Sequence, residues 1–194
     1  MRQTNTHGQG LLETIIALGI IVSGIVGMLS LTISNQASSV EAADRLIAVH
    51  LAREGIEFAR NMRDSNWIAR AVWDTGLENG SDYTATPLFD ITTNTWTLDF
   101  TPDAISHIYA RLWRTGGVYF QSTLDPVEGA TLTNYKRLLQ FDEICQDKTV
   151  SSSGTACTAG VNPKIGIRVQ SIVEWESKGN TRQIVLEERL FNWR

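Results

Sequence analysis

The sequence predicts an α+β fold in which one long N-terminal helix packs through its second half on an antiparallel β-sheet. Three observations predict it. The chain has no charged residue between Thr14 and Val40 and no proline before Pro87. Apolar residues between positions 40 and 62 recur at helical spacing. Beyond residue 95, apolar and polar residues alternate in short runs separated by turn residues, which is typical of strands.

The composition is that of a folded domain. The 194 residues are 42% hydrophobic and 20% charged, which is ordinary for a chain that buries a core. There are 17 Lys and Arg against 21 Asp and Glu, so the formal net charge is -4. This weakly acidic balance provides no electrostatic footprint for nucleic acid, although a local basic patch would escape it, and nucleic-acid binding stays open.

The first expected element is an apolar helix. Thr14 to Ile33 is dominated by Ile, Leu, Val, Ala and Gly, and as a helix it spans roughly 30 Å, the thickness of a bilayer's hydrocarbon core. A secretory signal has a shorter apolar region of about 7–15 residues. A plain single-span anchor explains the length but not Glu13, because an unpaired carboxylate near the bilayer costs about 2.5–3.5 kcal/mol.

The residues before the apolar run carry a processing motif. The chain opens MRQTNTHG and continues QGLLETII, so a short polar segment ends at Gly8 and Glu13 is the fifth residue after it. This resembles the N-terminal motif of type IV pilins and type II secretion pseudopilins, in which a prepilin peptidase cuts after the glycine and methylates the new terminus. One departure is Gln9, where the family usually has Phe or Met.

The resemblance implies a leader peptide at 1–8, cleavage between Gly8 and Gln9, N-methylation of Gln9, and a transmembrane and assembly helix at 9–35. It also implies that Glu13 neutralises the free amine of Gln9 on a neighbouring subunit. Two opposite charges about 4 Å apart interact by about 4 kcal/mol at an effective dielectric of 20. Judged from the apolar run alone, an equal alternative is an interfacial Glu13 that reaches the lipid headgroups.

Small residues recur at every fourth position of the run, at Gly19, Ser23 and Gly27. Such a stripe lies on one helix face and allows another helix to pack closely in a membrane. The alternative is that glycine is simply frequent in membrane spans. The stripe is therefore a candidate helix-packing surface.

The helix is expected to run from about Leu11 to about Trp67. Its second half has one apolar face, formed by Val40, Ile47, Leu51, Phe58 and Met62. Oppositely charged residues stand four apart on its surface: Glu41 and Arg45, Arg53 and Glu57, Arg60 and Asp64. The stretch 43–63 resembles minor pilins of the pilus-modification type, although a generic amphipathic helix would look much the same.

The remainder is expected to be strands, so that a globular head at 36–194 combines a helix at 36–68 with a β-sheet at 90–194. Alternating residues predict strands around 96–100, 108–112, 118–120, 139–141, 165–175 and 184–190. Turns are predicted at Gly116-Gly117 and at 177–180, and loops over Asp74–Asp90 and Asp147–Pro163. The final hairpin, ending in Phe191-Asn192-Trp193-Arg194, also resembles the pilus-modification group.

The two cysteines, Cys145 and Cys157, flank a loop rich in Ser, Thr and Gly. In an exported head they are expected to pair, since exported proteins meet an oxidising environment, and the alternative is two unpaired thiols.

Searches for catalytic arrangements find none: there is no His-Glu-x-x-His, no Gly-x-Ser-x-Gly and no phosphate loop. No metal site or cofactor is expected. The aspartates at 82, 90, 99 and 103 fit no calcium-binding loop and are interpreted as solvated turn residues.

The resemblance implies a structural minor pilin or pseudopilin of a type IV pilus or a related secretion or DNA-uptake machine, rather than an enzyme. Its implied partners are the prepilin peptidase and methyltransferase, other major and minor pilins in a helical filament, and the inner-membrane assembly platform. Its implied location is the cytoplasmic membrane, with an exported head, and then the filament. The alternative is a single-span, membrane-anchored binding or adhesin domain, and a secreted enzyme is a third, disfavoured interpretation.

Overall fold

The computed structural model describes residues 7–79, 83–90, 95–151 and 157–192. The chain forms two compact units, residues 1–45 and 46–194. The helix α1 (His7–Ile68) is 62 residues long and contributes to both. It begins a few residues before the predicted start and ends one residue after the predicted end.

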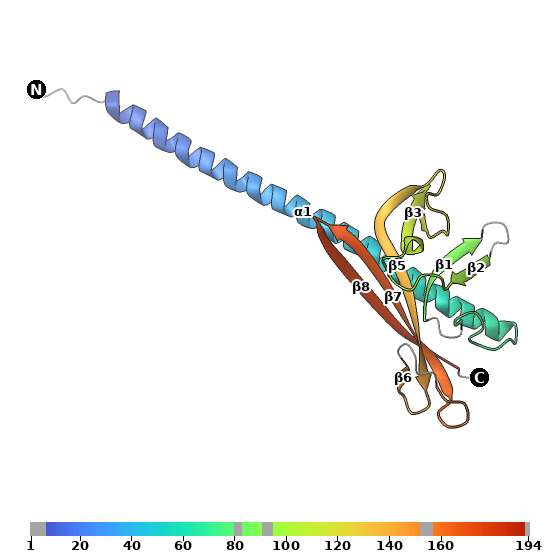
Figure 1. Ribbon diagram of the computed structural model, residues 1–194. Coiled ribbons are helices and arrows are strands. Elements are labelled where there is room, and N and C mark those ends of the chain that lie inside the picture. The colour runs from blue at the N-terminus through green and yellow to red at the C-terminus, as the bar shows by residue number, and fades with distance from the viewer. Residues whose placement is uncertain (1–6, 80–82, 91–94, 152–156, 193–194) are drawn as a thin grey trace, which may run out of the picture. The chain divides into compact units, whose positions relative to one another are not determined.

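The second unit contains an antiparallel sheet. Its strands are β1 (Thr84–Asp90), β2 (Thr95–Asp99), β3 (Arg111–Thr115), β4 (Val118–Phe120), β5 (Thr131–Cys145), β6 (Val150–Ser151), β7 (Lys164–Ser177) and β8 (Asn180–Phe191). The long strands β5, β7 and β8 run side by side (Figure 1). Along the other edge of β5 lie β3, β1 and β6 in turn, with β4 outside β3 and β2 outside β1. The predicted α+β class is confirmed.

Both predicted hairpin turns are present. In the β7–β8 turn, Lys178 and Gly179 have φ of 53° and 74°. In the β3–β4 turn, Gly116 and Gly117 have φ of 55° and 87°. Two successive residues at positive φ make a type I′ turn, whose twist matches that of the flanking strands, and glycine adopts this conformation without a steric penalty.

The loop predicted over Asp74–Asp90 is wrong for its last seven residues, which form β1. Pro87 lies inside this strand, and proline is rare in strands because it cannot donate a ladder hydrogen bond. Here β1 pairs with β5 only at Thr84 and Ala85, whereas Pro87 faces Leu98 of β2. At Pro87, β1 therefore has a strand partner on one side and none on the other. A proline is tolerated there because no ladder hydrogen bond is required from its nitrogen.

Three further strand predictions need correction. The strand expected at 139–141 extends over the 15 residues of β5, and Ile108–Ala110 is a short 3₁₀ helix rather than part of a strand. The loop predicted over Asp147–Pro163 contains the short strand β6. Most of β5 was not predicted because the strand pairs along both edges and is covered on both faces, so that Arg137, Leu138 and Leu139 are all buried and the alternation is lost.

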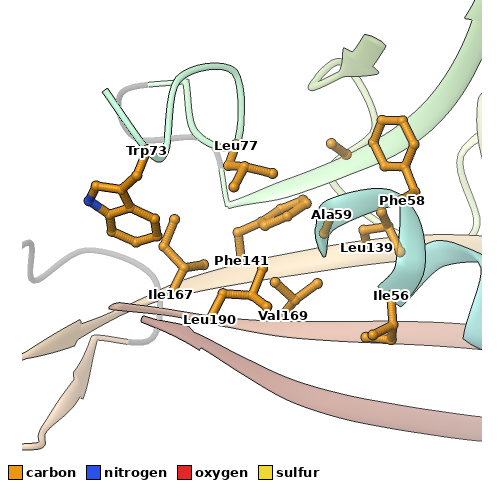
Figure 2. Packing of buried hydrophobic residues seen from close by; sticks show 11 residues of the cluster. Ile56, Phe58, Ala59, Trp73, Leu77, Leu139, Phe141, Ile167, Val169 and Leu190 are labelled. Carbon is orange, nitrogen blue, oxygen red and sulfur yellow. The ribbon is translucent and has the colours of Figure 1, made fainter. Parts of the chain in front are cut away.

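The larger core cluster lies between α1 and the helix-facing side of the sheet (Figure 2). The helix supplies Ile56, Phe58 and Ala59, and the segment after it supplies Trp73 and Leu77. The strands supply Ala85, Leu139, Phe141, Ile167, Val169 and Leu190. Because alternate strand residues point to one face, these positions are spaced by two within β5 and β7.

A second cluster extends the core toward the start of the head. It contains Ala48, Leu51, Ala52, Leu112, Tyr135, Val173 and Trp175. Of the predicted helix face, Leu51 and Phe58 are buried, and Ile47 and Met62 pack against the clusters. Val40 is 57% exposed and does not belong to the core, so this part of the prediction is wrong. Val40 falls in the first unit, which ends at Arg45.

Candidate functional site: the apolar half of α1

The first half of α1 is apolar around its whole circumference. Its large side chains are more than half exposed: Leu11, Leu12, Ile15, Ile16, Leu18, Ile20, Ile21, Val22, Ile25, Val26, Met28, Leu29, Leu31 and Ile33. Successive helical residues are turned by about 100°, so these positions cover every side. Among the described residues, α1 is the one helix long and apolar enough to cross a membrane, by length and composition.

Four hydroxyl groups in this half of α1 are satisfied by the helix itself. Each donates to the carbonyl oxygen four residues earlier, at 2.8–3.0 Å: Thr14 to Gly10, Ser23 to Gly19, Thr32 to Met28, and Ser38 to Ser34. An unpaired polar group in hydrocarbon costs roughly several kcal/mol. The hydrogen bond from each hydroxyl to the carbonyl oxygen of its own helix avoids that cost. These four hydroxyl groups are therefore compatible with a lipid environment.

The small-residue stripe leaves the helix backbone open. A Cβ added at Gly19 or Gly27 would meet no atom within 4 Å. The hydroxyl of Ser23, which lies between them, is bonded back to the Gly19 carbonyl at 2.8 Å and so stays close to the helix. The arrangement leaves room for another helix to approach closely, and the helix-packing surface stays a prediction.

The residues of the processing motif lie at the start of α1. Gly8 and Gln9 are in its first turn, and Glu13 is exposed one turn later. Positions 9 and 13 are four residues apart and therefore lie on one side of the helix. Glu13 is the one charged residue between positions 10 and 40. No Lys or Arg stands between positions 10 and 40, so this stretch offers Glu13 no counter-charge.

The head contains a cluster of ionisable groups around Lys164 at the start of β7. Its ammonium contacts the carboxylates of Asp74 and Glu78, from the segment after α1, and lies 3.8 Å from the Glu143 carboxylate of β5. Glu143 also accepts a hydrogen bond of 2.7 Å from the Cys157 amide. The ring of Trp73 lies 5.8 Å from the ammonium and covers one side of the cluster.

Burial and hydrogen bonding shift the pKa values in this cluster. Burial raises the pKa of Glu78 above its ordinary value, and the hydrogen bond with Asp74 adds to the increase against the opposing effect of Lys164. Burial would also raise the pKa of Asp74, but the bonds with Lys164 and Glu78 outweigh it and hold that pKa low. For Lys164 the two carboxylates outweigh burial and raise the pKa. The two carboxyls therefore differ in proton affinity.

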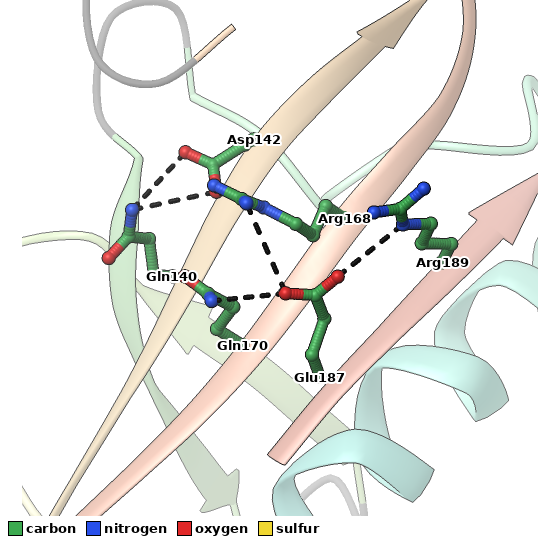
Figure 3. Close-up of polar contacts among 6 residues, drawn as sticks. All are labelled: Gln140, Asp142, Arg168, Gln170, Glu187 and Arg189. Atoms are coloured by element: carbon green, nitrogen blue, oxygen red, sulfur yellow. Dashed lines mark hydrogen bonds and ion pairs between the residues drawn. The ribbon is translucent and has the colours of Figure 1, made fainter. Parts of the chain in front are cut away.

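A second polar cluster lies on the sheet face opposite α1 (Figure 3). Arg168 of β7 donates to Asp142 of β5 from Nε at 2.9 Å and from Nη2 at 2.7 Å. Glu187 of β8 accepts from Gln170 at 3.2 Å and from Arg189 at 3.4 Å. The network crosses three neighbouring strands, and its two arginines balance its two carboxylates. It is best explained as a cross-strand contact that stabilises the sheet.

A third polar group is buried between α1 and the sheet. The guanidinium of Arg137 on β5 is 1% exposed, donates to the carbonyl oxygen of Leu51 at 3.1 Å and to Gln121 at 2.9 Å, and lies 3.4 Å from the Glu54 carboxylate. Burial lowers its pKa, and Glu54 opposes that shift. The contacts attach α1 to β5, a structural role that fully occupies the side chain.

An open groove of about 580 Å³ runs along β2 and its continuation. Met62, Trp96, Leu98 and Phe100 line its apolar part. Trp96 is 42% exposed and is held by ring contacts with Phe58 at 5.4 Å and Phe89 at 4.9 Å.

The predictions about the cysteines and about metal ligands concern the head. Cys145 and Cys157 form a disulfide, as expected. No group of three or more His, Cys, Asp or Glu side chains within the described parts of the chain is arranged to hold a metal ion. Of the aspartates considered as calcium ligands, Asp82 lies outside the described residues. Asp99 instead accepts hydrogen bonds from the amide and hydroxyl of Thr101.

No protein-family model, curated protein or solved structure matches this chain. The apolar segment and its motif can be found in the local sequence, whereas the Lys164 cluster and the buried Arg137 cannot. Asp74 and Lys164 are 90 positions apart, and no local pattern links them. The one local signal was the glycine at position 55 within a predicted helix, which indicates a close packing contact.

Proposed function

We propose that this chain is a minor pilin or pseudopilin: a structural subunit that is inserted in the cytoplasmic membrane, processed by a prepilin peptidase and assembled into a type IV pilus or related filament. The observation that carries the proposal is the register Gly8, Gln9, Glu13 at the start of a helix that is apolar on all sides. A helix of this kind needs either lipid or other helices around it.

Two further observations support the proposal. The small-residue stripe is open for a neighbouring helix, and four hydroxyl groups of this half of α1, that of Ser23 in the stripe included, are already bonded to its own backbone. In such an assembly the helix exchanges lipid for the helices of other subunits. Glu13 would then pair with the methylated amine of Gln9 on the next subunit, because a lone carboxylate in that environment is costly.

The competing candidate is a membrane-anchored binding domain whose head uses the groove along β2, with its exposed Trp96. The two candidates differ in the state of the N-terminus. Processing makes Gln9 the first residue and methylates it, whereas a plain anchor keeps the residues before it.

The experiment is N-terminal analysis by mass spectrometry of the protein from membranes, for the wild type and for Gly8→Val. We expect a chain that begins at methylated Gln9 in the wild type and an uncut chain in the variant, because the bulky side chain blocks the peptidase. Gly10→Val is the matched control and should be processed normally. A wild-type chain that retains residues 1–8 in cells producing a prepilin peptidase would contradict the proposal.

A further inference from the structure

The strand β2 lies at a margin of the sheet and has one free edge (Figure 1). Within the described part of the chain its one strand partner is β1, with which it pairs from Thr95 to Asp99. In an antiparallel ladder, the main-chain N–H and C=O groups of alternate residues point away from the partner strand. A free edge of this kind can accept a further strand from another chain.

The open groove of about 580 Å³ follows this free edge. All residues from Trp96 to Thr101 line it, together with Met62 of α1 and residues of the segment after α1, among them Glu78. Successive residues of a strand point to opposite faces of a sheet. A groove that is lined by every residue of such a stretch therefore runs along the edge of the sheet and not over one of its faces.

We propose that this groove binds an extended peptide segment of a partner protein, which adds as a strand to β2 and places an arginine side chain against Trp96. This inference goes beyond the proposed function and does not depend on it, because a filament subunit and a membrane-anchored domain would present the same groove. An extended peptide fits the site because its main-chain groups repeat with the same spacing as those along the free edge.

The charge of the groove favours a cationic residue in the peptide. Its two ionisable lining residues, Glu78 and Asp99, are both acidic. Glu78 belongs to a cluster in which three carboxylates share the one ammonium of Lys164, so negative charge is in excess. Asp99 accepts the two hydrogen bonds from Thr101 through Oδ1, and its Oδ2 has no hydrogen-bond partner in the described part of the chain.

The aromatic surface of the groove favours arginine over lysine. The Trp96 side chain is 42% exposed, and ring contacts with Phe58 of α1 and Phe89 of β1 hold it in place. A planar guanidinium can stack on an indole ring and also reach a carboxylate with its remaining N–H groups, which an ammonium cannot do as well. Trp96 and the two carboxylates together therefore select arginine.

The longest free edge of the sheet, at β8, lacks these properties. Four of its side chains are charged: Arg182, Glu187, Glu188 and Arg189. Charged side chains along an edge disfavour pairing with another chain, which is how natural sheets protect their edges. In contrast, β2 carries one charged residue, at its last position, and an exposed indole.

The test begins with a synthetic library of random hexapeptides, blocked at both ends, and the detergent-purified full-length protein. Peptides retained by the protein are identified by mass spectrometry. We expect arginine to be enriched among them with the wild type and not with the double variant Glu78→Gln, Asp99→Asn. Glu143→Gln removes a carboxylate of the same cluster outside the groove and should keep the enrichment. No retained peptide with the wild type, or equal arginine enrichment with the double variant, would overturn the proposal.

N-methylation of a retained peptide tests the strand pairing itself. Successive N–H groups of a strand point to opposite edges, so methylating one alternate set should weaken binding by about tenfold or more, and methylating the other set by no more than about twofold. Fluorescence anisotropy measures both dissociation constants. Equal effects of the two sets would contradict strand addition.

Replacing the arginine of the same peptide by citrulline removes its charge and keeps its shape. Binding to the wild type should weaken by about threefold to tenfold, whereas binding to the double variant should hardly change. Trp96→Ala should also weaken binding of the arginine peptide. An intact Cys145–Cys157 disulfide and a native circular-dichroism spectrum confirm that each variant is folded. If neutral oligosaccharides bind the wild type but not Trp96→Ala, and no hexapeptide is retained, the groove is a saccharide site and the proposal is wrong.

Discussion

Gly55 sets the distance between α1 and the sheet. It is buried, and a Cβ at this position would lie 2.6 Å from the Ser171 hydroxyl oxygen and 2.7 Å from a Leu139 methyl carbon. Leu139 and Ser171 are themselves 0% exposed, so neither has free space in which to move. A glycine here costs helix propensity of about 1 kcal/mol relative to alanine. The close packing of the helix on the sheet compensates for that cost.

We therefore predict that Gly55→Ala lowers the free energy of unfolding of the head by about 1–2 kcal/mol. Overpacking a filled core costs about 1–3 kcal/mol, and the better helix propensity of alanine offsets part of it. Urea unfolding followed by tryptophan fluorescence measures the change. A variant as stable as the wild type would show that the helix moves away from the sheet at no cost.

Ser171→Ala is the matched partner for this substitution. The Ser171 hydroxyl is buried with no hydrogen-bond partner, so we expect its removal to change stability by no more than about 0.5 kcal/mol or to increase it. In the double variant one of the two close contacts is gone, and about half of the loss caused by Gly55→Ala should be recovered. Additive effects in the double-mutant cycle would contradict a contact between the two positions.

Single residues also show where sequence reasoning stops. Gly55 stands out in the sequence because glycine is unusual within a helix. Arg137 and Lys164 look like ordinary surface cations, and their burial depends on contacts with Leu51 and Asp74, far away in the chain. Such contacts follow from the path of the backbone, which no local pattern records.

Strands with one covered face were easier to predict from the sequence than strands with both faces covered. The β7–β8 hairpin has alternation and a type I′ turn, and its turn and most of both strands were predicted. The central strand β5 pairs along both edges and was predicted at a fraction of its length. β1 was missed because Pro87 argues against a strand unless the pairing on each side is known. Alternation of apolar and polar residues indicates a strand with one face toward solvent. The alternation is lost where both faces of the strand are covered.

The disulfide joins the end of β5 to Cys157, inside the loop predicted over Asp147–Pro163, with a separation of 12 positions. Closing a loop of this size in the unfolded chain removes entropy worth about 3 kcal/mol. We predict that replacing both Cys145 and Cys157 by Ala lowers the free energy of unfolding by about that amount. Denaturant unfolding of the head measures it, and the reduced wild type should match the double variant.

Alkylation provides an independent check on the same bond. Without reductant, both cysteines should be protected from iodoacetamide, and after reduction both should react. Free thiols in the native protein would remove this covalent bond from the description of the head, without altering the helix or the sheet.

At the scale of the molecule, the two units differ in what they need from their surroundings. Every buried hydrophobic residue of the described core lies at or after Ala48. Between residues 10 and 45, the part of the first unit whose burial is described, no residue is buried, and the large apolar side chains are exposed. The head therefore has a complete core without the first 35 residues.

We predict that residues 36–194 fold as a soluble domain. Heteronuclear magnetic resonance should find a helix over 46–68, because its buried face and its bond with Arg137 are retained. A shorter chain that begins at residue 56 is the contrast, since it lacks Ala48, Leu51 and Ala52 and should aggregate or unfold. A disordered or extended 46–68 segment in the longer chain would contradict this architecture.

The apolar unit supplies the last prediction, which follows from the proposed assembly. Glu13→Ala removes the one charge between positions 10 and 40, so the helix should enter a membrane at least as readily as the wild type. Cleavage after Gly8 should persist. Incorporation into sheared filaments, measured by quantitative immunoblotting, should fall by roughly tenfold or more, because each 1.4 kcal/mol lost at a subunit contact costs about a factor of ten.

Glu41→Ala removes the next carboxylate along the chain, outside the apolar segment, and should assemble normally. A carboxylate that only reaches the lipid headgroups predicts no difference between the two variants. If Glu13→Ala inserts normally but assembles poorly, and Glu41→Ala does both normally, Glu13 makes a subunit contact and the helix is more than a simple anchor.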